Sequence, residues 1–432
     1  MSTDARPPLV QLASYNTALQ GLHGVPQDLV DWLSPTLDVS NFLARVPTAP
    51  DIVAVGFQEL LPLHLGLSGL SRSIIENRNA LILSQIEAHA PNKERYSLVA
   101  KVVNVGVALL VYAKDEGIAR QVRDVQTQWT GCGPLYMGNK GAVGVRFRVV
   151  ADESDPGEVY TFVCAHLAAH EPKLAQRVAD YNYIVQSLLF PPLPDSPSHA
   201  NTTLYSTSHL FFLGDFNFRI SLPSTHALAG TANRPALLAA LSTEDGRKQL
   251  KEYDQLVVER ENGSCFQLLR EADFWRFQCS YKYKIGEVDR YSSKRQPAWT
   301  DRILYTTYTD SPDTPDKSNI TSLLYTSIPS YTTSDHKPIV SLLLLPPPAP
   351  TSPPRSSIPT LRLPPTFQPT PDRLAVLKRY TGRTLDRLVG YVWWLLVVIG
   401  AGNAALGVGN FLLGLGAVSW WRSRPAGGAA SV

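Results

Sequence analysis

Short apolar runs alternate with stretches of helical periodicity between residues 9 and 345. The runs DIVAVGFQEL, ALLVYAK, GAVGVRFRVV, YTFVCAHLA and HLFFLGDF are apolar at nearly every position and rich in β-branched residues, so they predict strands buried on both faces. The stretches SRSIIENRNALILSQIEAH and PKLAQRVADYNYIVQSLLF carry apolar residues at helical spacing and predict covering helices. Residues 1–345 are therefore expected to form one layered α/β (α+β) domain.

Beyond this domain the pattern changes to proline. Residues 346–371 contain 11 prolines in 26 positions, a density that disfavours helix and sheet and predicts an extended linker. Part of the linker, PPAPTSPP, also suits an SH3-type partner, although most proline-rich linkers are plain spacers. The folded domain is therefore expected to end at Leu345.

A second change follows at residue 388. Residues 388–421 carry no formal charge over 34 positions, which exceeds the ~20 helical residues that cross a bilayer core. The sequence predicts a C-terminal transmembrane helix here. A re-entrant hairpin is the alternative, because the segment contains seven glycines together with Asn403 and Asn410.

The flanks of the apolar segment predict its orientation. Residues 372–387 form a basic juxtamembrane segment with five lysines and arginines, whereas the short tail at 422–432 has two arginines. The excess of positive charge before the segment predicts that the large domain faces the cytosol. The organelle stays open, with the endoplasmic reticulum or another endomembrane fitting this topology.

Composition narrows the class of protein further. Hydrophobic residues make up 44% of the chain and charged residues 18%, as in a globular protein. The net charge of +3 gives no indication of nucleic-acid binding. The four cysteines are widely separated and form no CxxC pair, so they indicate neither a disulfide scaffold nor a structural zinc site.

Polar residues appear abruptly where the buried runs end. Glu59 closes DIVAVGFQE, and Asn16 follows LVQLASY. Such oxygens suit Mg²⁺, which takes one or two carboxylates and leaves its other positions to water and phosphate oxygens. Asp215 and Asn217 lie on one side of the continuation of HLFFLG, where they could hold and deprotonate a water molecule. Each of these residues alone would more often be an ordinary hydrogen-bonded loop residue.

Two histidines and two further aspartates complete the candidate site. His166 closes the run YTFVCAH and is a donor suited to a phosphate oxygen. Asp301 lies in PAWTDRIL, and Asp335 directly precedes His336. An aspartate paired with a histidine orients the imidazole and raises its basicity. No cysteine has an arginine six positions later, so the sequence offers no Cys-x5-Arg loop that would supply a cysteine nucleophile.

These motifs together resemble the inositol polyphosphate 5-phosphatase family, within the broader deoxyribonuclease I-like superfamily. The resemblance covers residues 9–345 and rests on SYNTALQG, GFQEL, MGNKGAVGVRF, CAHLAAHE, GDFNFRI, SYKY, PAWTDRIL and SDHKP. It implies a four-layer sandwich, in which two mixed β-sheets pack face to face with helices outside.

The resemblance also implies roles for the polar residues. Mg²⁺ would bind at Glu59 with help from Asn16. Asp215 would activate a water that Asn217 orients. The 5-phosphate would be held by His166 and by His336, with Asp301 supporting His336. Whether Asp215 or the pair of His336 and Asp301 is the general base stays open.

A basic substrate pocket follows from the same resemblance. Asn139 and Lys140 match the family's contact to the 1-phosphate of the inositol ring. The contacts to the 4-phosphate match Tyr281, Lys282 and Arg295. Family members commonly carry a basic residue two positions before that arginine, where this chain has a serine. Recognition of the 4-phosphate is therefore either weaker or served by the neighbouring Lys294.

The expected function is Mg²⁺-dependent removal of the 5-phosphate from phosphoinositide lipids at a membrane, most of all from phosphatidylinositol 4,5-bisphosphate, with soluble inositol phosphates as further candidates. One alternative is a nuclease or sphingomyelinase-like phosphodiesterase of the same superfamily. The basic SYKY and KRQPAW elements argue against it. A second alternative is an inactive membrane adaptor that binds phosphoinositides, against which the complete set of polar site residues argues.

Overall fold

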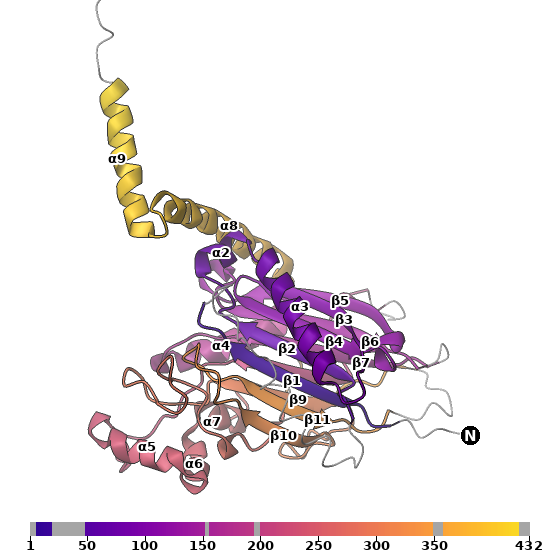
Figure 1. The fold of residues 1–432 in the computed structure, drawn as a ribbon. Coiled ribbons are helices and arrows are strands. Elements are labelled where there is room, and N and C mark those ends of the chain that lie inside the picture. The colour runs from indigo at the N-terminus through magenta and orange to yellow at the C-terminus, as the bar shows by residue number, and fades with distance from the viewer. Residues whose placement is uncertain (1–5, 20–47, 152–154, 194–198, 349–356, 423–432) are drawn as a thin grey trace, which may run out of the picture.

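The computed structural model describes residues 6–19, 48–151, 155–193, 199–348 and 357–422, and these form two β-sheets packed face to face (Figure 1). The first sheet has the strand order β10-β11-β1-β2-β4-β3, and the second has the order β5-β6-β7-β8-β9. Both sheets are mixed, because β1 pairs with β2 and β7 pairs with β8 in parallel while the other pairs are antiparallel.

The strands are β1 (Leu9–Asn16), β2 (Ile52–Gln58), β3 (Tyr96–Asn104), β4 (Val107–Lys114), β5 (Val122–Gly131), β6 (Gly141–Val149), β7 (Glu158–His166), β8 (His209–Asp215), β9 (Asp301–Thr307), β10 (Thr321–Ser327) and β11 (Ile339–Leu344). The helices are α2 (Leu63–Ser68), α3 (Arg72–His89), α4 (Leu174–Ser187), α5 (Arg234–Ser242), α6 (Glu244–Leu250), α7 (Gln255–Glu261), α8 (Ala375–Ile399) and α9 (Ala404–Arg422).

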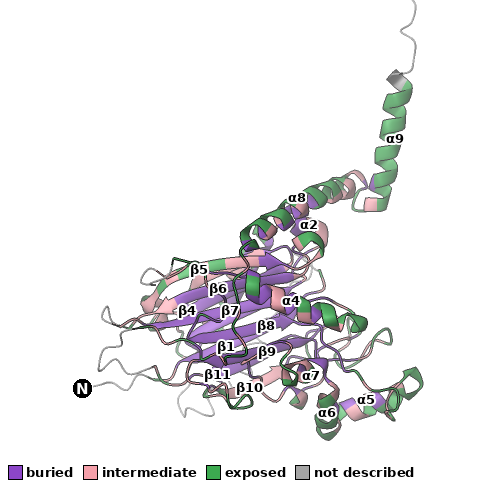
Figure 2. Cartoon of the chain, turned by 180° about the vertical axis from the view of Figure 1, so that it is seen from behind, coloured by how far each residue is buried: buried purple, intermediate pink, exposed green. Residues whose placement is uncertain are grey.

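Three hydrophobic clusters build the layers. Inward-facing side chains such as Leu12, Leu109, Phe162 and Leu213 fill the space between the two sheets. Isoleucines of α3 pack on the outer face of the first sheet, and Tyr181 and its neighbours on α4 pack on the outer face of the second. The apolar strands are therefore covered on both sides (Figure 2), and the expected four-layer sandwich is confirmed.

Strand direction brings the polar strand ends to one edge. The parallel strands β1 and β2 end at Asn16 and Gln58, and the parallel strands β7 and β8 end at His166 and Asp215. In β9, which runs antiparallel to β8, the first residue is Asp301, and its register partner is Asp215. Five strands from both sheets therefore present polar side chains at the same edge of the sandwich.

The proline-rich segment does not leave the domain as the expected free spacer. Leu361 is buried in the cluster beneath α4, and its N–H donates to the carbonyl of Thr207 at 2.9 Å. The hydroxyl of Ser208 donates to the carbonyl of Pro359 at 2.6 Å. Residues 357–371 therefore extend the fold beyond Leu345, because their few apolar residues find a place on its surface. The expected SH3-type motif falls mostly on 349–356, outside the described residues, as does most of the tail.

The apolar C-terminal segment is also different from the single continuous helix that was expected. It is divided between α8 and α9, which meet at an angle of 82°. Within the described residues no single helix is long and apolar enough to span a membrane by itself, whereas this bent pair, taken together, has the length and composition of a broken span or a re-entrant loop. The backbone explains why the helix breaks here. Ala401 and Gly402 have positive φ, and the side chain of Asn403 accepts the N–H of Ala405 and caps α9.

The basic segment before it packs on protein. The guanidinium group of Arg383 lies 4.0 Å from the ring centre of Trp129 on β5, and Arg379 hydrogen-bonds Gln128 on the same strand. Arg387 donates to the carbonyl of Leu67 in α2 at 2.6 Å. Figure 1 shows α8 beginning against the domain near α2 and then leading away to α9. These arginines therefore contact the domain instead of extending from it as a free juxtamembrane segment.

Candidate active site

The polar strand ends surround one cleft of about 510 Å³. Most of the residues predicted from the sequence line it: Asn16, Glu59, Lys140, His166, Asp215, Asn217, Tyr281, Lys282, Arg295, Asp335 and His336. Asp301 lies behind His336 and is fully buried. The structure therefore brings together side chains that are separated by up to 320 positions in the sequence, as expected for a working site.

Asp215 is the residue that most others contact. Its Oδ2 accepts a hydrogen bond from the amide of Asn16 at 2.9 Å and lies 3.3 Å from Nε2 of His166. Its Oδ1 accepts the backbone N–H of Asn217 at 3.0 Å. Burial opposes the charge of this carboxyl, but the hydrogen bond to His166 and the charges of His336, His166 and Lys140 hold its pKa well below its usual range. The carboxylate is therefore ionised at neutral pH.

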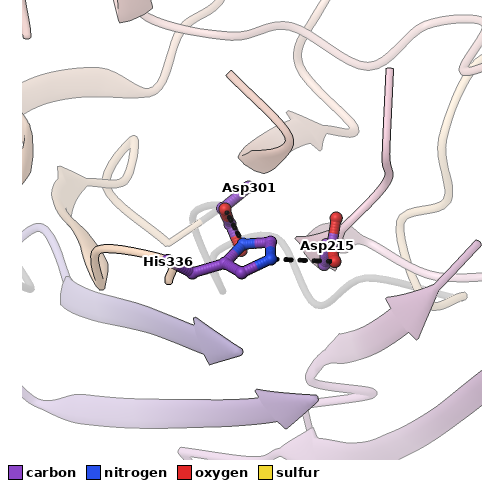
Figure 3. Close-up of side chains that lie close together, drawn as sticks. All are labelled: Asp215, Asp301 and His336. Carbon is purple, nitrogen blue, oxygen red and sulfur yellow. Dashed lines mark hydrogen bonds and ion pairs between the residues drawn. The ribbon is translucent and has the colours of Figure 1, made fainter. Parts of the chain in front are cut away.

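His336 is held between two carboxylates (Figure 3). Its Nδ1 is 2.9 Å from Oδ2 of Asp301, and its Nε2 is 3.9 Å from Oδ2 of Asp215. Burial lowers the pKa of this imidazole, but the charges of Asp301 and Asp215 outweigh that effect and raise the pKa to about 9. The imidazole is consequently protonated at neutral pH, with Nε2 directed toward Asp215.

Asp335 does not orient His336, in contrast to the first expectation from their adjacency. Its Oδ2 accepts a hydrogen bond from the ammonium group of Lys282. The partner of His336 is Asp301, 35 positions earlier, as the family resemblance implied. Adjacent residues in an extended segment point to opposite sides, so neighbours in sequence are poorly placed to bind each other's side chains.

Arg219 and His170 are among the residues that line the cleft and were missed by the sequence analysis. Arg219 donates to Oδ1 of Asn217 at 2.5 Å, and its guanidinium lies 4.4 Å from the ring centre of Tyr281. His170 also lines the cleft, with φ of 77°. The arginine lies in the motif GDFNFRI, so its place two residues after Asn217 was the available signal. Asn217 itself is fixed from two sides, because its amide also donates to the carbonyl of Leu167 at 3.2 Å.

Oxygen atoms suited to a divalent metal lie at the end of β1 and directly after β2. Glu59 has φ of 49° and lines the cleft, with Oε1 3.9 Å from Nε2 of His166. Asn16 contributes an amide oxygen beside it, which accepts the N–H of Ala18 at 3.0 Å and retains a second lone pair. An oxygen-only donor set with room for water and phosphate fits Mg²⁺.

A second group of candidate ligand atoms fits a metal less well. Atoms of Asp215, Asp301 and His336 lie within 4.8 Å of one another. However, a histidine must be neutral to bind a metal, and the pKa of His336 is raised to about 9. Its Nδ1 is also engaged by Asp301. We therefore interpret this group as a hydrogen-bonded network beside the metal-binding oxygens of Glu59 and Asn16.

Of the four lysines and arginines predicted to bind substrate, three line the cleft and one does not. Lys282 and Arg295 line the cleft, and so does Lys140, whose ammonium group contacts the imidazole of His166. Burial lowers the pKa of Lys140, although Asp215 and Glu59 act in the opposite direction. Lys294 does not line the cleft.

The expected contact from Asn139 is not seen in the described cleft. Its Oδ1 is buried without a hydrogen-bond partner among the described residues. It lies so close to Gly133 that a Cβ at that glycine would stand 1.9 Å away. The side chain is therefore packed against the loop at 131–140 instead of lining the cleft with Lys140.

Comparisons with known proteins agree with this fold and site. The family described as Endonuclease/Exonuclease/phosphatase family 2 matches residues 13–342. Synaptojanin-2 of Homo sapiens is 31% identical over 284 residues, which are 64% of this chain and 17% of that protein. Type II inositol 1,4,5-trisphosphate 5-phosphatase of Mus musculus is 31% identical over 319 residues, which are 72% of this chain and 28% of that protein. The matches thus span less than a third of either relative.

Solved structures share the same architecture. The inositol polyphosphate 5-phosphatase domain of SPsynaptojanin, in complex with inositol (1,4)-bisphosphate and calcium ion, is 26% identical, with a TM-score of 0.57 over 79% of this chain and 84% of that one. A Cimex nitrophorin, 19% identical with a TM-score of 0.53 over 78% of this chain and 98% of that one, shares the fold alone. From the family match, the relatives and the domain structure together, the chain belongs to the inositol polyphosphate 5-phosphatase family.

Proposed function

We propose that this chain is a phosphoric monoester hydrolase that removes the 5-phosphate of phosphoinositides in a Mg²⁺-dependent reaction. The preferred substrate would be phosphatidylinositol 4,5-bisphosphate, which would yield phosphatidylinositol 4-phosphate. The observation that carries the proposal is the ionised Asp215 facing a cleft that also holds protonated His336 and four lysine and arginine side chains. The names of the relatives support it, as does the inositol bisphosphate bound by the matching domain.

The residues of the cleft have separate roles in this proposal. A water molecule attacks the phosphorus atom, the bond from phosphorus to the 5-oxygen of the ring breaks, and that oxygen takes up a proton from solvent and leaves as a hydroxyl group. Asp215 accepts the proton of this water, because it is ionised and faces the cleft, whereas His336 is already protonated. Asn217, whose amide is held by Leu167 and Arg219, orients the water. The positive charge of His336 stabilises the negative charge on the phosphoryl group, whereas Lys140 binds another phosphate of the substrate.

Glu59 and the amide oxygen of Asn16 would hold the Mg²⁺ ion, which when bound neutralises phosphate charge and polarises the bond that breaks. His166 stands between this position and Asp215, with its Nε2 3.9 Å from Glu59 and 3.3 Å from Asp215. In this proposal, a phosphate oxygen of the bound substrate takes the place of Asp215 as the acceptor of the hydrogen bond from Nε2 of His166.

A nuclease or sphingomyelinase-like phosphodiesterase would share the polar strand ends. The basic side of the cleft favours an inositol that bears several phosphates. Lys282 donates a hydrogen bond to Asp335. Burial lowers the pKa of this lysine, but the contact with Asp335 outweighs burial, and the pKa is raised. With Arg295, Lys282 provides two positive charges that line the cleft, as recognition of a 4-phosphate requires. Soluble inositol phosphates carry the same groups and are proposed as further substrates.

A membrane location is part of the proposal. The second half of α8 and α9 up to Trp420 expose large apolar side chains, including Leu388 at 61%, Leu412 at 60% and Leu413 at 73% exposed (Figure 2). An apolar surface of this extent is unfavourable in water and favourable in a bilayer. We propose that this bent pair anchors the chain in an endomembrane, such as the endoplasmic reticulum, with the domain in the cytosol.

Removing either partner of the reacting pair is expected to abolish most of the activity. Asp215→Asn and His336→Ala should each lower turnover at least about a hundredfold, the effect of losing a positioned base or charge donor. Phosphate release from lipid and soluble substrates measures this loss. In the wild type, chelation of divalent metal should abolish phosphate release, and added Mg²⁺ should restore it. Asp313→Ala and His89→Ala, which lie outside the cleft, serve as controls. Undiminished hydrolysis by a folded Asp215→Asn protein would exclude Asp215 as the base.

The basic side of the cleft should determine the response to the 4-phosphate. Lys282→Met or Arg295→Ala should raise the apparent KM at least about fivefold for lipids with a 4-phosphate, since a charge-assisted contact is lost, and much less for lipids without it. Steady-state kinetics on the two lipid classes measure the ratio. Lys284→Ala removes a nearby exposed cation and should leave the ratio of the two KM values unchanged. Equal losses on both classes would show that these residues do not recognise the 4-phosphate.

The anchor can be tested by extraction of membranes at alkaline pH. The full chain should stay with the membranes. The double variant Leu412→Arg and Leu413→Arg should be released, because each arginine costs about 3 kcal/mol at the centre of a membrane helix. The matched control is Val125→Arg with Ile285→Arg, which adds two arginines to exposed apolar positions of the domain. Release of the wild-type chain would contradict anchoring by this segment.

A further inference from the structure

The first half of α8 packs against the loop that carries Lys140. Both carboxylate oxygens of Asp386 lie 3.1 Å from the backbone nitrogen of Gly138, which donates to them. One turn earlier, Gly382 lies on the same loop, where a Cβ would stand 1.9 Å from the carbonyl oxygen of Tyr136. Asp386 is 3% exposed, and burial raises its pKa to about 6, so it is ionised at neutral pH and accepts this N–H. The helix is therefore fitted closely to the loop.

The loop connects this contact to the active site within two residues. Gly138 precedes Asn139 and Lys140, and the ammonium group of Lys140 contacts His166 in the cleft. The N–H of Cys132 donates to the carbonyl of Lys140 at 2.9 Å, which closes the loop. Leu135 and Tyr136 have φ of 52° and 66°, values that such residues seldom adopt. A strained loop needs contacts from its surroundings to persist, and α8 supplies two of them.

The same helix also contacts the end of β3 and the helix α2, which lie near Glu59 in the sequence or by hydrogen bonding. Arg383 approaches Oδ1 of Asn104 at 3.4 Å, at the end of β3 and directly before the turn to β4. In that turn, the carbonyl of Gly106 accepts the N–H of Leu60 at 3.0 Å, directly after Glu59. Arg387 holds the carbonyl of Leu67 in α2, which begins four residues after Glu59. The helix thus supports both the segment after Glu59 and the loop before Lys140.

We propose that Asp386 is a positioning residue of the active site: by holding the N–H of Gly138, it fixes the loop at 131–140 and thereby places Lys140 beside His166. The helix that leads into the apolar C-terminal segment is then part of the framework of the cleft. Because α8 is one helix from Ala375 to Ile399, it also fixes the orientation of the cleft relative to its apolar half. The kinetic consequence rests on the proposed phosphatase function, whereas the contact with the loop does not.

The test uses the full-length chain with three substitutions. Asp386→Ala removes both accepting oxygens, whereas Asp386→Asn retains one. Thr381→Ala changes an exposed residue of the same helix and is the matched control. The first measurement is backbone hydrogen exchange of the peptide at 133–141. The second is steady-state kinetics on a soluble inositol carrying phosphates at positions 1, 4 and 5, which separates active-site positioning from membrane binding.

Asp386→Ala should increase exchange at Gly138 and raise KM about tenfold while kcat stays within about twofold, because a misplaced binding group weakens substrate binding more than it changes the water attack. In Asp386→Asn, the exchange at Gly138 and the KM should both stay close to the wild-type values. Thr381→Ala should match the wild type in both. A merely structural role would instead lower the unfolding temperature and the active fraction with KM unchanged, and that result would overturn the proposal.

The two proposals fail in different ways. A wild-type chain that releases no phosphate from any inositol phosphate would contradict the proposed function. Unchanged exchange at Gly138 in Asp386→Ala would overturn the positioning role whatever the activity, because the N–H would then not depend on this carboxylate. Wild-type KM in an Asp386→Ala chain with increased exchange would also overturn it, since the loop would have been freed without consequence for substrate.

Discussion

The buried carboxylate of Asp215 is the interaction on which the active site depends. A carboxylate without partners in the interior would cost several kcal/mol, so its donors must be in place whenever the chain is folded. They come from both sheets: Asn16 from β1, His166 from β7 and the backbone N–H of Asn217 after β8. The site can therefore form only when the two sheets have packed together. The same partners keep Asp215 ionised, and its charge in turn helps to keep His336 protonated.

The sequence predicts the parts of the site that follow from strands. An apolar run that ends in a polar residue places that residue at a strand end, and Asn16, His166 and Asp215 all conform to this. The partner of His336 could not be derived in this way. Adjacency favoured Asp335, whereas the structure pairs the imidazole with Asp301 from the start of β9. Only the family resemblance indicated the long-range pair, because spacing alone says nothing about how distant strands meet.

The C-terminal part was harder to predict from the sequence. Proline density and a run of arginines are local signals, and they indicated a spacer and a juxtamembrane segment. The structure instead places Leu361 in a core cluster and Arg383 over Trp129, because these residues find partners more than 150 positions away. The break after Ile399 did have a local signal. The glycines of the apolar segment and Asn403 had suggested a re-entrant hairpin as the alternative to one continuous helix. The result is a domain joined to its apolar segment by a docked helix.

The central claim, that His336 is held protonated between Asp301 and Asp215, can be measured by NMR. A pH titration of ¹⁵N-labelled histidine in the full chain without divalent metal, with His336 assigned from a His336→Gln spectrum, gives its pKa directly. The account predicts a pKa of about 9 in the wild type and a lower value in Asp215→Asn, because one of the two flanking charges is lost. A wild-type His336 that titrates at or below the ordinary histidine value of 6.5 would contradict it.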